Sequence, residues 1–291
     1  MHTMTALLLS AHALPLSHAL RVAFIGGGNM ASAIIGGLVA HGTLPAHIQV
    51  VEPHAEQRAK LAAQFGVTAT AQPDDALSQA DLVVWAVKPQ TFQAAAGQAK
   101  AHTGHALHLS VAAGIRSDSI ARWLGCERVV RAMPNTPALV GKGMTALFAR
   151  PAVSPADRQA VQAVLGPTGE LMWLDPTAGE SQLDAVTALS GSGPAYVFYF
   201  LEAMSAAGVG MGLSSADAHR LAVATFVGAS ALALASPDAP EVLRARVTSK
   251  GGTTHAALSH MEGAHLKQHF MAAMAVARQR AVELGDEFGA A

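Results

Sequence analysis

A glycine-rich turn near the start of the chain constrains the fold more than any other feature. Gly26-Gly-Gly28-Asn-Met-Ala31 follows the apolar run Arg21–Ile25 and opens a small-residue helical stretch, Ala31–His41. In such a G-x-G-x-x-G/A pattern the first glycine allows a tight turn, the second lets the backbone approach a pyrophosphate, and the third small residue lets helix and strand pack closely. The turn therefore predicts a dinucleotide site, with a purely structural glycine turn as the alternative.

The chain after this turn alternates short apolar runs with helical stretches, which is typical of βαβ units and a mostly parallel sheet. After Thr177 the strand signals stop and helical patterns continue, including Ala178–Leu189. We therefore predict an α/β fold: a Rossmann-type dinucleotide-binding domain over residues 21–177 and an all-helical domain over 178–291, with residues 1–20 as an N-terminal extension. The further strands are expected at 48–51, 82–87, 107–111, from 129, 143–148 and 170–174.

The composition is poor in charge and argues against a nucleic-acid-binding protein. Only 13% of the residues are charged, against roughly 25% in a typical globular protein. The 19 basic and 20 acidic residues form no basic run, so no nucleic-acid partner is expected. So little charge indicates that a second subunit covers part of the surface, and we predict that the helical domain dimerises.

Neither a membrane nor a metal is expected as a partner. No continuous apolar run reaches the 18 residues of a membrane span, and the apolar segment 5–20 lacks the basic start of a signal peptide. The single cysteine, Cys126, favours the reducing cytoplasm, and the scattered histidines predict no metal site.

Glu52, after the second predicted strand, bears on which cofactor is used. An acidic residue at this place usually accepts hydrogen bonds from the adenosine ribose, which favours NADH. His54, Arg58 and Lys60 follow closely and could instead accept the 2′-phosphate of NADPH. An exposed acid at a helix start is the plain alternative, so the sequence leaves NADH and NADPH both open.

Other strand ends supply further candidates, because ligands bind outside the carboxyl ends of parallel strands. Ala86–Pro89 brings Lys88, which is either a cofactor contact or a solvated loop lysine. Ser110–Gly114 has the small residues that let a dinucleotide lie against the backbone. In Arg131-Ala-Met-Pro-Asn-Thr-Pro137, Asn135 could bind the nicotinamide amide, and a plain turn fits equally well.

A second glycine pair lies in the helical half, in Thr248-Ser-Lys-Gly-Gly-Thr-Thr254, before a helix predicted over His255–Met261. Glycines and hydroxyl residues at a helix start present a nest of backbone N–H donors, which suits a small carboxylate. A capped helix with a glycine turn is the alternative.

Taken together, five motifs resemble the Δ1-pyrroline-5-carboxylate reductase family, from about Arg21 to Leu284. They are Phe24-Ile-Gly-Gly-Gly-Asn-Met-Ala31, Ala86-Val-Lys-Pro89, Arg131-Ala-Met-Pro-Asn-Thr-Pro137, Leu189-Ser-Gly-Ser-Gly-Pro-Ala-Tyr196 and Ser249-Lys-Gly-Gly-Thr-Thr254. The resemblance implies NAD(P)H-dependent reduction of the cyclic imine 1-pyrroline-5-carboxylate to L-proline, the last step of proline biosynthesis. It also implies a homodimer at least. Dimers of this family often assemble further into decamers.

The resemblance also implies the residues of the site. The substrate would bind at Gly251, Gly252, Thr253 and Thr254, facing the cofactor of the adjoining subunit, with Thr254 as the catalytic residue whose hydroxyl lies on the ring nitrogen. The expected cofactor contacts are Ile25, Gly26, Gly27, Gly28, Asn29, Met30, Glu52, His54, Ala86, Val87, Lys88, Pro89, Val111, Ala112, Ala113, Gly114 and Asn135.

Two residues depart from the family pattern, and three alternatives remain. Lys250 stands where the family often has proline, and Glu52 where some members have a small hydroxyl residue. A reductase of a related cyclic imine would share these motifs. A β-hydroxyacid dehydrogenase would carry a catalytic lysine after its glycine-rich helix motif, which the segment from Ala207 to Ser215 lacks. A non-catalytic dinucleotide-binding regulator would be expected to have lost the nest, which is intact.

Overall fold

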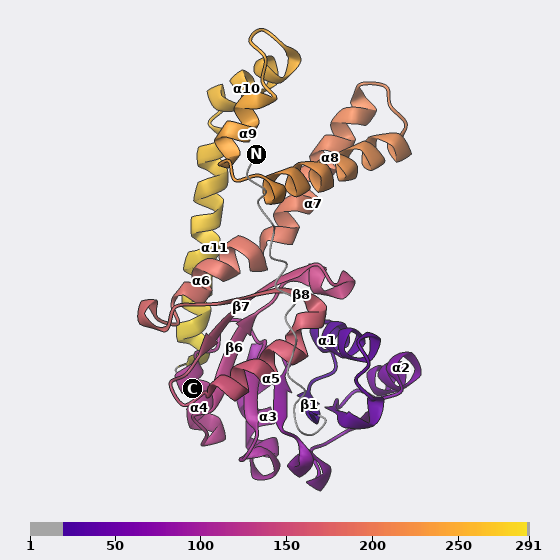
Figure 1. The fold of residues 1–291 in the computed structure, drawn as a ribbon, viewed down its shortest axis with the longest axis vertical. Helices are drawn as coiled ribbons and strands as arrows, with labels where there is room; N and C mark the ends of the chain where they lie inside the picture. The colour runs from indigo at the N-terminus through magenta and orange to yellow at the C-terminus, as the bar shows by residue number, and fades with distance from the viewer. Residues whose placement is uncertain (1–19, 290–291) are drawn as a thin grey trace, which may run out of the picture.

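The computed structural model describes residues 20–289, so the extension expected over residues 1–20 lies outside this range except for Leu20. Its centre is one eight-stranded sheet with the strand order β3-β2-β1-β4-β5-β6-β7-β8 (Figure 1). Neighbouring strands are parallel except for the β6–β7 pair. The strands are β1 (Val22–Ile25), β2 (Ile48–Val51), β3 (Thr68–Thr70), β4 (Leu82–Trp85), β5 (Leu107–Ser110), β6 (Val129–Met133), β7 (Gly143–Ala149) and β8 (Gly169–Trp173).

Two apolar cores cover the two faces of this sheet, as the continuous apolar strands require. One core joins the sheet to α1 (Asn29–Ala40), α2 (Ala55–Phe65) and α5 (Pro155–Leu165). The other joins it to α3 (Pro89–Thr103) and α4 (Ser117–Leu124). Every residue of β1, β4 and β5 is buried, which confirms a doubly covered sheet of the Rossmann type.

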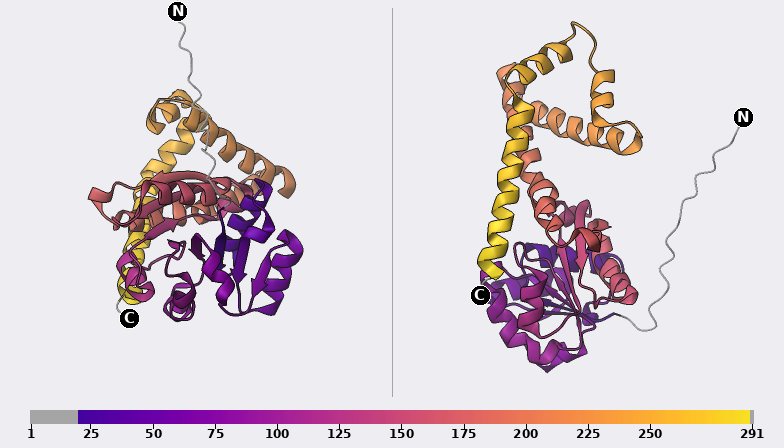
Figure 2. Two further views of the ribbon diagram at one scale, coloured as in Figure 1. Left: turned by 60° about the horizontal axis from the view of Figure 1, so that its bottom comes forward. Right: turned by 90° about the vertical axis from the view of Figure 1, so that its left-hand side faces the viewer.

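The remaining helices form an arm that projects from the sheet (Figures 1 and 2). Helices α7 and α8 pack against each other, and α11 runs the length of the arm back to α4. They are α6 (Gln182–Val186), α7 (Gly193–Gly210), α8 (Ser215–Ala235), α9 (Pro240–Arg246), α10 (Thr253–Gly263) and α11 (Leu266–Gly289).

The helix predicted over 178–189 is wrong in extent. The backbone there makes a short 3₁₀ turn at Pro176–Ala178, then α6, and then a π-helical turn over Thr187–Gly191. A π turn leaves one extra residue in the helix, and such turns occur frequently at functional sites. Within this turn the carbonyl of Ser190 accepts a hydrogen bond from the amide of Asn135, which ties the arm to the loop after β6.

Large apolar side chains are exposed along the arm. Phe198 and Tyr199 on α7 are 62% and 70% exposed, and Leu221, Val227 and Leu234 on α8 are also exposed. One helix of the described chain, α8, is long and apolar enough to cross a membrane by length and composition. The sequence analysis considered only uninterrupted apolar runs and so did not single out this helix, whose small residues keep its mean hydropathy high.

Helix α11 ends against the Rossmann half. A Cβ added at Gly114 would lie 3.0 Å from Cβ of Leu284, and one at Gly285 would lie 2.7 Å from the guanidinium of Arg116. Gly114 has φ +76°, which favours glycine, so the loop after β5 and the last helix fit only with small residues at both places. The same guanidinium makes two hydrogen bonds to Asp184 on α6, at 3.0 and 2.9 Å.

Candidate active site

The glycine turn joins β1 to α1 with the geometry that its motif predicts. Gly26 has φ +94°, and a Cβ there would lie 2.7 Å from the carbonyl oxygen of Ala86, so only glycine fits between β1 and β4. Gly28 is the extended N-cap of α1 and has no side-chain cap, and a Cβ there would meet nothing within 4 Å. The first N–H groups of α1 therefore lack a side-chain partner at an open helix N-terminus, which suits a pyrophosphate.

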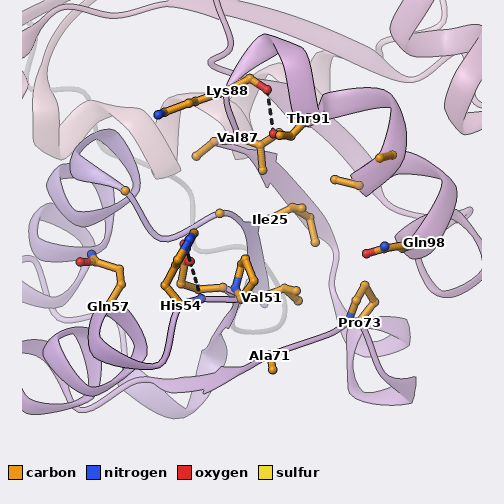
Figure 3. Close-up of a pocket in the computed structure, with 17 residues that line it drawn as sticks. Ile25, Val51, His54, Gln57, Ala71, Pro73, Val87, Lys88, Thr91 and Gln98 are labelled. Atoms are coloured by element: carbon orange, nitrogen blue, oxygen red, sulfur yellow. Dashed lines mark hydrogen bonds and ion pairs between the residues drawn. The ribbon is translucent and has the colours of Figure 1, made fainter.

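A cavity of about 710 Å³ opens beside this turn, at the carboxyl ends of β1, β2 and β4 (Figure 3). In Figure 3, His54 and Gln57 lie on one side of it and Gln98 and Pro73 on the other. The cavity lies at the topological switch point of the sheet, where the strand order reverses between β1 and β4. Rossmann-type folds bind dinucleotides at this point. The lining residues are Ile25, Gly26, Gly28, Val51, Glu52, Pro53, His54, Gln57, Ala71, Pro73, Ala86, Val87, Lys88, Thr91, Ala94, Ala95 and Gln98.

Glu52 places a buried carboxylate in the wall of this cavity. One carboxylate oxygen accepts a hydrogen bond from the N–H of Gly27 at 2.9 Å, and the other accepts from the N–H of His54 at 2.9 Å. Burial alone would raise the pKa of Glu52, but the hydrogen bonds from His54 and Gly27 outweigh it and hold the pKa below its ordinary value. Glu52 is therefore an anion at neutral pH.

Several expected cofactor contacts lie outside this cavity. Gly27 faces Glu52 and Leu61. The loop from Val111 to Gly114 follows β5, and its Gly114 packs against Leu284 of α11. The amide of Asn135 donates to Ser190 and accepts the N–H of Met144 at 3.0 Å, so it links two backbone segments. Gly27, Asn29, Met30, Pro89, Val111, Ala112, Ala113, Gly114 and Asn135 do not line the cavity, and their contact with the cofactor stays a prediction.

Several residues that line the cavity are absent from the expected cofactor contacts. Thr91, Ala94, Ala95 and Gln98 form the wall that α3 contributes, and Ala71 and Pro73 follow β3. A helix wall of small and polar residues carries no motif. Thr91, Ala95 and Gln98 are each about one helical turn apart, so they share one face of α3. This spacing could have identified them once α3 was known to begin at the end of β4.

The second glycine pair forms the start of α10. Gly251 has φ +76°, and Gly252 is the extended N-cap, again without a side-chain cap. Thr253 and Thr254 occupy the first turn and are exposed, so their backbone N–H groups and hydroxyls are available to a ligand. This nest is chemically suited to a small carboxylate.

Within one chain the nest and the cavity do not meet. Helix α10 lies on the arm beside α11, at the end far from the sheet, whereas the cavity lies among β1, β2 and α3 (Figures 1 and 2). A ligand in the cavity could contact such a nest only if another chain supplied it.

A doubly covered Rossmann sheet, a cavity at its topological switch point and an apolar helical arm define the class of two-domain dinucleotide-binding proteins. Residues 180–284 match the family model described as pyrroline-5-carboxylate reductase dimerisation, and residues 21–114 match the model described as NADP oxidoreductase coenzyme F420-dependent. Pyrroline-5-carboxylate reductases of Pseudomonas aeruginosa and Haemophilus influenzae are 44% and 40% identical to the chain. These alignments cover 92% and 90% of the chain and 98% and 97% of the relatives.

Solved structures agree with this assignment. A pyrroline-5-carboxylate reductase from Coxiella burnetii has a TM-score of 0.83 at 36% identity, over 92% of this chain and 99% of that one. Plasmodium falciparum pyrroline carboxylate reductase with NADP bound has a TM-score of 0.82 at 26% identity, over 91% and 98%. The chain belongs to the pyrroline-5-carboxylate reductase family, and it is an oxidoreductase that uses NAD(P)H.

Proposed function

We propose that the chain reduces the C=N bond of 1-pyrroline-5-carboxylate to give L-proline, at sites that each combine two subunits. The cavity beside Gly26 and Gly28 would hold the dinucleotide, and the nest Gly251–Thr254 of the adjoining subunit would hold the substrate. The separation of nest and cavity within one chain carries this proposal. The substrate itself follows from the family to which the chain belongs.

The residues of the nest would act chiefly by position. NAD(P)H, when bound, supplies the hydride. The backbone N–H groups of Thr253 and Thr254 would hold the substrate carboxylate, and the Thr254 hydroxyl would orient the ring nitrogen or relay a proton to it from water. A hydroxyl does not titrate near neutrality, so Thr254 is not a strong acid. Correct placement accounts for most of the rate enhancement that we ascribe to these groups.

The apolar arm would supply the subunit contact. We propose a homodimer at least, with residues 178–291 as the dimerisation and substrate domain and 21–177 as the dinucleotide-binding domain. The exposed apolar faces of α7 and α8 are what a partner would cover. We also propose that α8 packs on its partner and not in a membrane, that the protein is cytoplasmic, and that dimers assemble further into decamers. Sizing the protein in dilute solution tests the assembly.

The reaction is tested by following cofactor oxidation with pyrroline-5-carboxylate, run separately with NADH and NADPH. We expect turnover that depends on the substrate and forms proline. Loss of absorbance without proline formation, or no turnover with either cofactor, would contradict the proposed function.

Thr254→Ala is expected to lower kcat/KM at least about tenfold, equivalent to about 1.4 kcal/mol of transition-state stabilisation. The hydroxyl is removed from the ring nitrogen, whereas the cavity lies elsewhere in the chain, so the Kd for the cofactor should stay within about twofold. Steady-state kinetics and cofactor titration measure the two effects separately. Thr248→Ala, whose hydroxyl bonds the Arg244 carbonyl at 2.7 Å, is a control. An unchanged kcat/KM in Thr254→Ala would remove this residue from the site.

A further inference from the structure

We infer that this chain selects the dinucleotide with a free 2′-hydroxyl, NADH, over its 2′-phosphorylated form, and that Glu52 is the residue that makes the selection. This inference rests on the proposed function, because it concerns the cavity assigned to the cofactor. It departs from what the NADP-bound relative alone would suggest, and it follows from this chain's own residues at the end of β2.

The first observation is the placement of the carboxylate. Glu52 follows directly on β2, is only 6% exposed, and lines the cavity together with Gly26 and Gly28. In folds of this type the acid at the end of the second strand faces the adenosine ribose. The geometry of the cavity therefore puts Glu52 where the 2′ substituent of a bound dinucleotide would lie.

The second observation is that backbone N–H groups fix the position of the Glu52 carboxylate by hydrogen bonds. The N–H groups of Gly27 and His54 each donate to a different oxygen of the carboxylate. The oxygen bonded to Gly27 accepts no other hydrogen bond from the described residues. A carboxylate oxygen can accept more than one hydrogen bond, so this oxygen can still accept from a ribose hydroxyl.

The third observation concerns Arg58 and His54, two of the basic residues near Glu52 that could bind a phosphate. The guanidinium of Arg58 donates to the backbone carbonyls of Glu52 and Pro53, at 2.8 and 2.7 Å. The ring of His54 lies with its Nδ1 2.6 Å from the Glu52 carboxylate. Both basic side chains are thus directed to the turn and to Glu52. A 2′-phosphate would meet the carboxylate, and like charges at such a site repel strongly.

Binding to the enzyme without substrate tests the selection directly. Isothermal titration with NADH and NADPH, and with 5′-AMP and adenosine 2′,5′-bisphosphate, isolates the contribution of the 2′-phosphate. We expect NADH to bind at least about tenfold more tightly than NADPH, and 5′-AMP more tightly than the bisphosphate.

The variant Glu52→Gln keeps an oxygen to accept the Gly27 N–H and removes the charge. We expect it to lower the NADPH-to-NADH ratio of Kd values at least about tenfold. Glu56→Gln, which removes an exposed carboxylate in the first turn of α2 and outside the cavity, is the matched control and should leave the ratio unchanged.

Two outcomes distinguish failure of this inference from failure of the proposed reductase function. NADPH binding as tightly as NADH, or an unchanged ratio in Glu52→Gln, would overturn the selection by Glu52 while proline formation with either cofactor still upheld the reductase. Failure of both dinucleotides to bind would overturn the selection and the assignment of the cavity together.

Discussion

Subunits that carry Gly28→Asp and subunits that carry Thr253→Glu are each expected to be inactive alone and to regain activity when they are mixed. Gly28 is the N-cap of α1 at the cofactor cavity, and Thr253 is the first residue of α10 at the nest. Both substitutions place a carboxylate at a helix start, where it favours the helix and so should preserve the fold. Each carboxylate would repel the anion that its helix end is proposed to bind.

Mixing the two variants distinguishes a shared site from one within a single chain. Random pairing makes half of the dimers mixed, and each mixed dimer would combine one intact cavity with one intact nest. The expected activity is therefore about a quarter of that of the unmodified enzyme. A site within one chain would recover none, because every chain carries one defect.

Neutral variants provide the controls for this experiment. Gly28→Asn and Thr253→Gln have similar size without the charge, so they should retain much more activity than the acidic variants. The mixture is prepared by co-expression with two different tags, and the doubly tagged dimer is assayed after purification. Absence of activity in that purified species would refute the shared site.

Glu180→Ala is expected to lower the free energy of unfolding by about 3–5 kcal/mol, because it leaves a buried guanidinium without its charge partner. Arg131 on β6 is 4% exposed, and it donates to the Glu180 carboxylate. The N–H of Ser117 donates to the same carboxylate at 2.8 Å, and the Ser117 hydroxyl donates as well. The substitution would thus remove the acceptor of both the Arg131 guanidinium and the Ser117 N–H.

The midpoint of urea unfolding measures this loss, at one fixed subunit concentration because the protein is proposed to be oligomeric. Glu170→Ala removes an exposed carboxylate on β8 and should change the stability by less than about 0.5 kcal/mol. The double variant Arg131→Met with Glu180→Leu should recover much of the loss, since apolar residues often replace a buried ion pair at little cost. Equal stability of Glu180→Ala and Glu170→Ala would show that the pair contributes nothing.

Much of the Rossmann half could be predicted from the sequence, because its signals are local. The β1–turn–α1 unit is specified by an apolar run followed at once by spaced glycines, and β2 matches its predicted bounds. Strand β3 was missed: Thr68–Thr70 is short, polar and only partly buried, so it lacks the apolar run that marked the others. The residues of β7 do not indicate that it runs antiparallel to β6, because the direction depends on how the two strands pair.

The site was less predictable where it depends on contacts across the chain. Asn135 was chosen because it follows a strand, and nothing local indicated that its amide donates to Ser190, 55 residues away. The motif containing Arg131 stood out, but nothing local pointed to Glu180 as its partner. Whether Arg58 faces a phosphate or the backbone likewise depends on the course of the turn after β2.

The return of α11 to α4 has a consequence for how the chain is made. The carbonyl of Gly289 accepts hydrogen bonds from Ser119 and Arg122, some 170 residues earlier. The sheet strands leave the ribosome long before α11 does. Until α11 is made, the surface of α4 that it contacts therefore stays uncovered. The contacts between α11 and α4 form only after the whole arm has emerged, so the first domain is completed after the helical arm has been made.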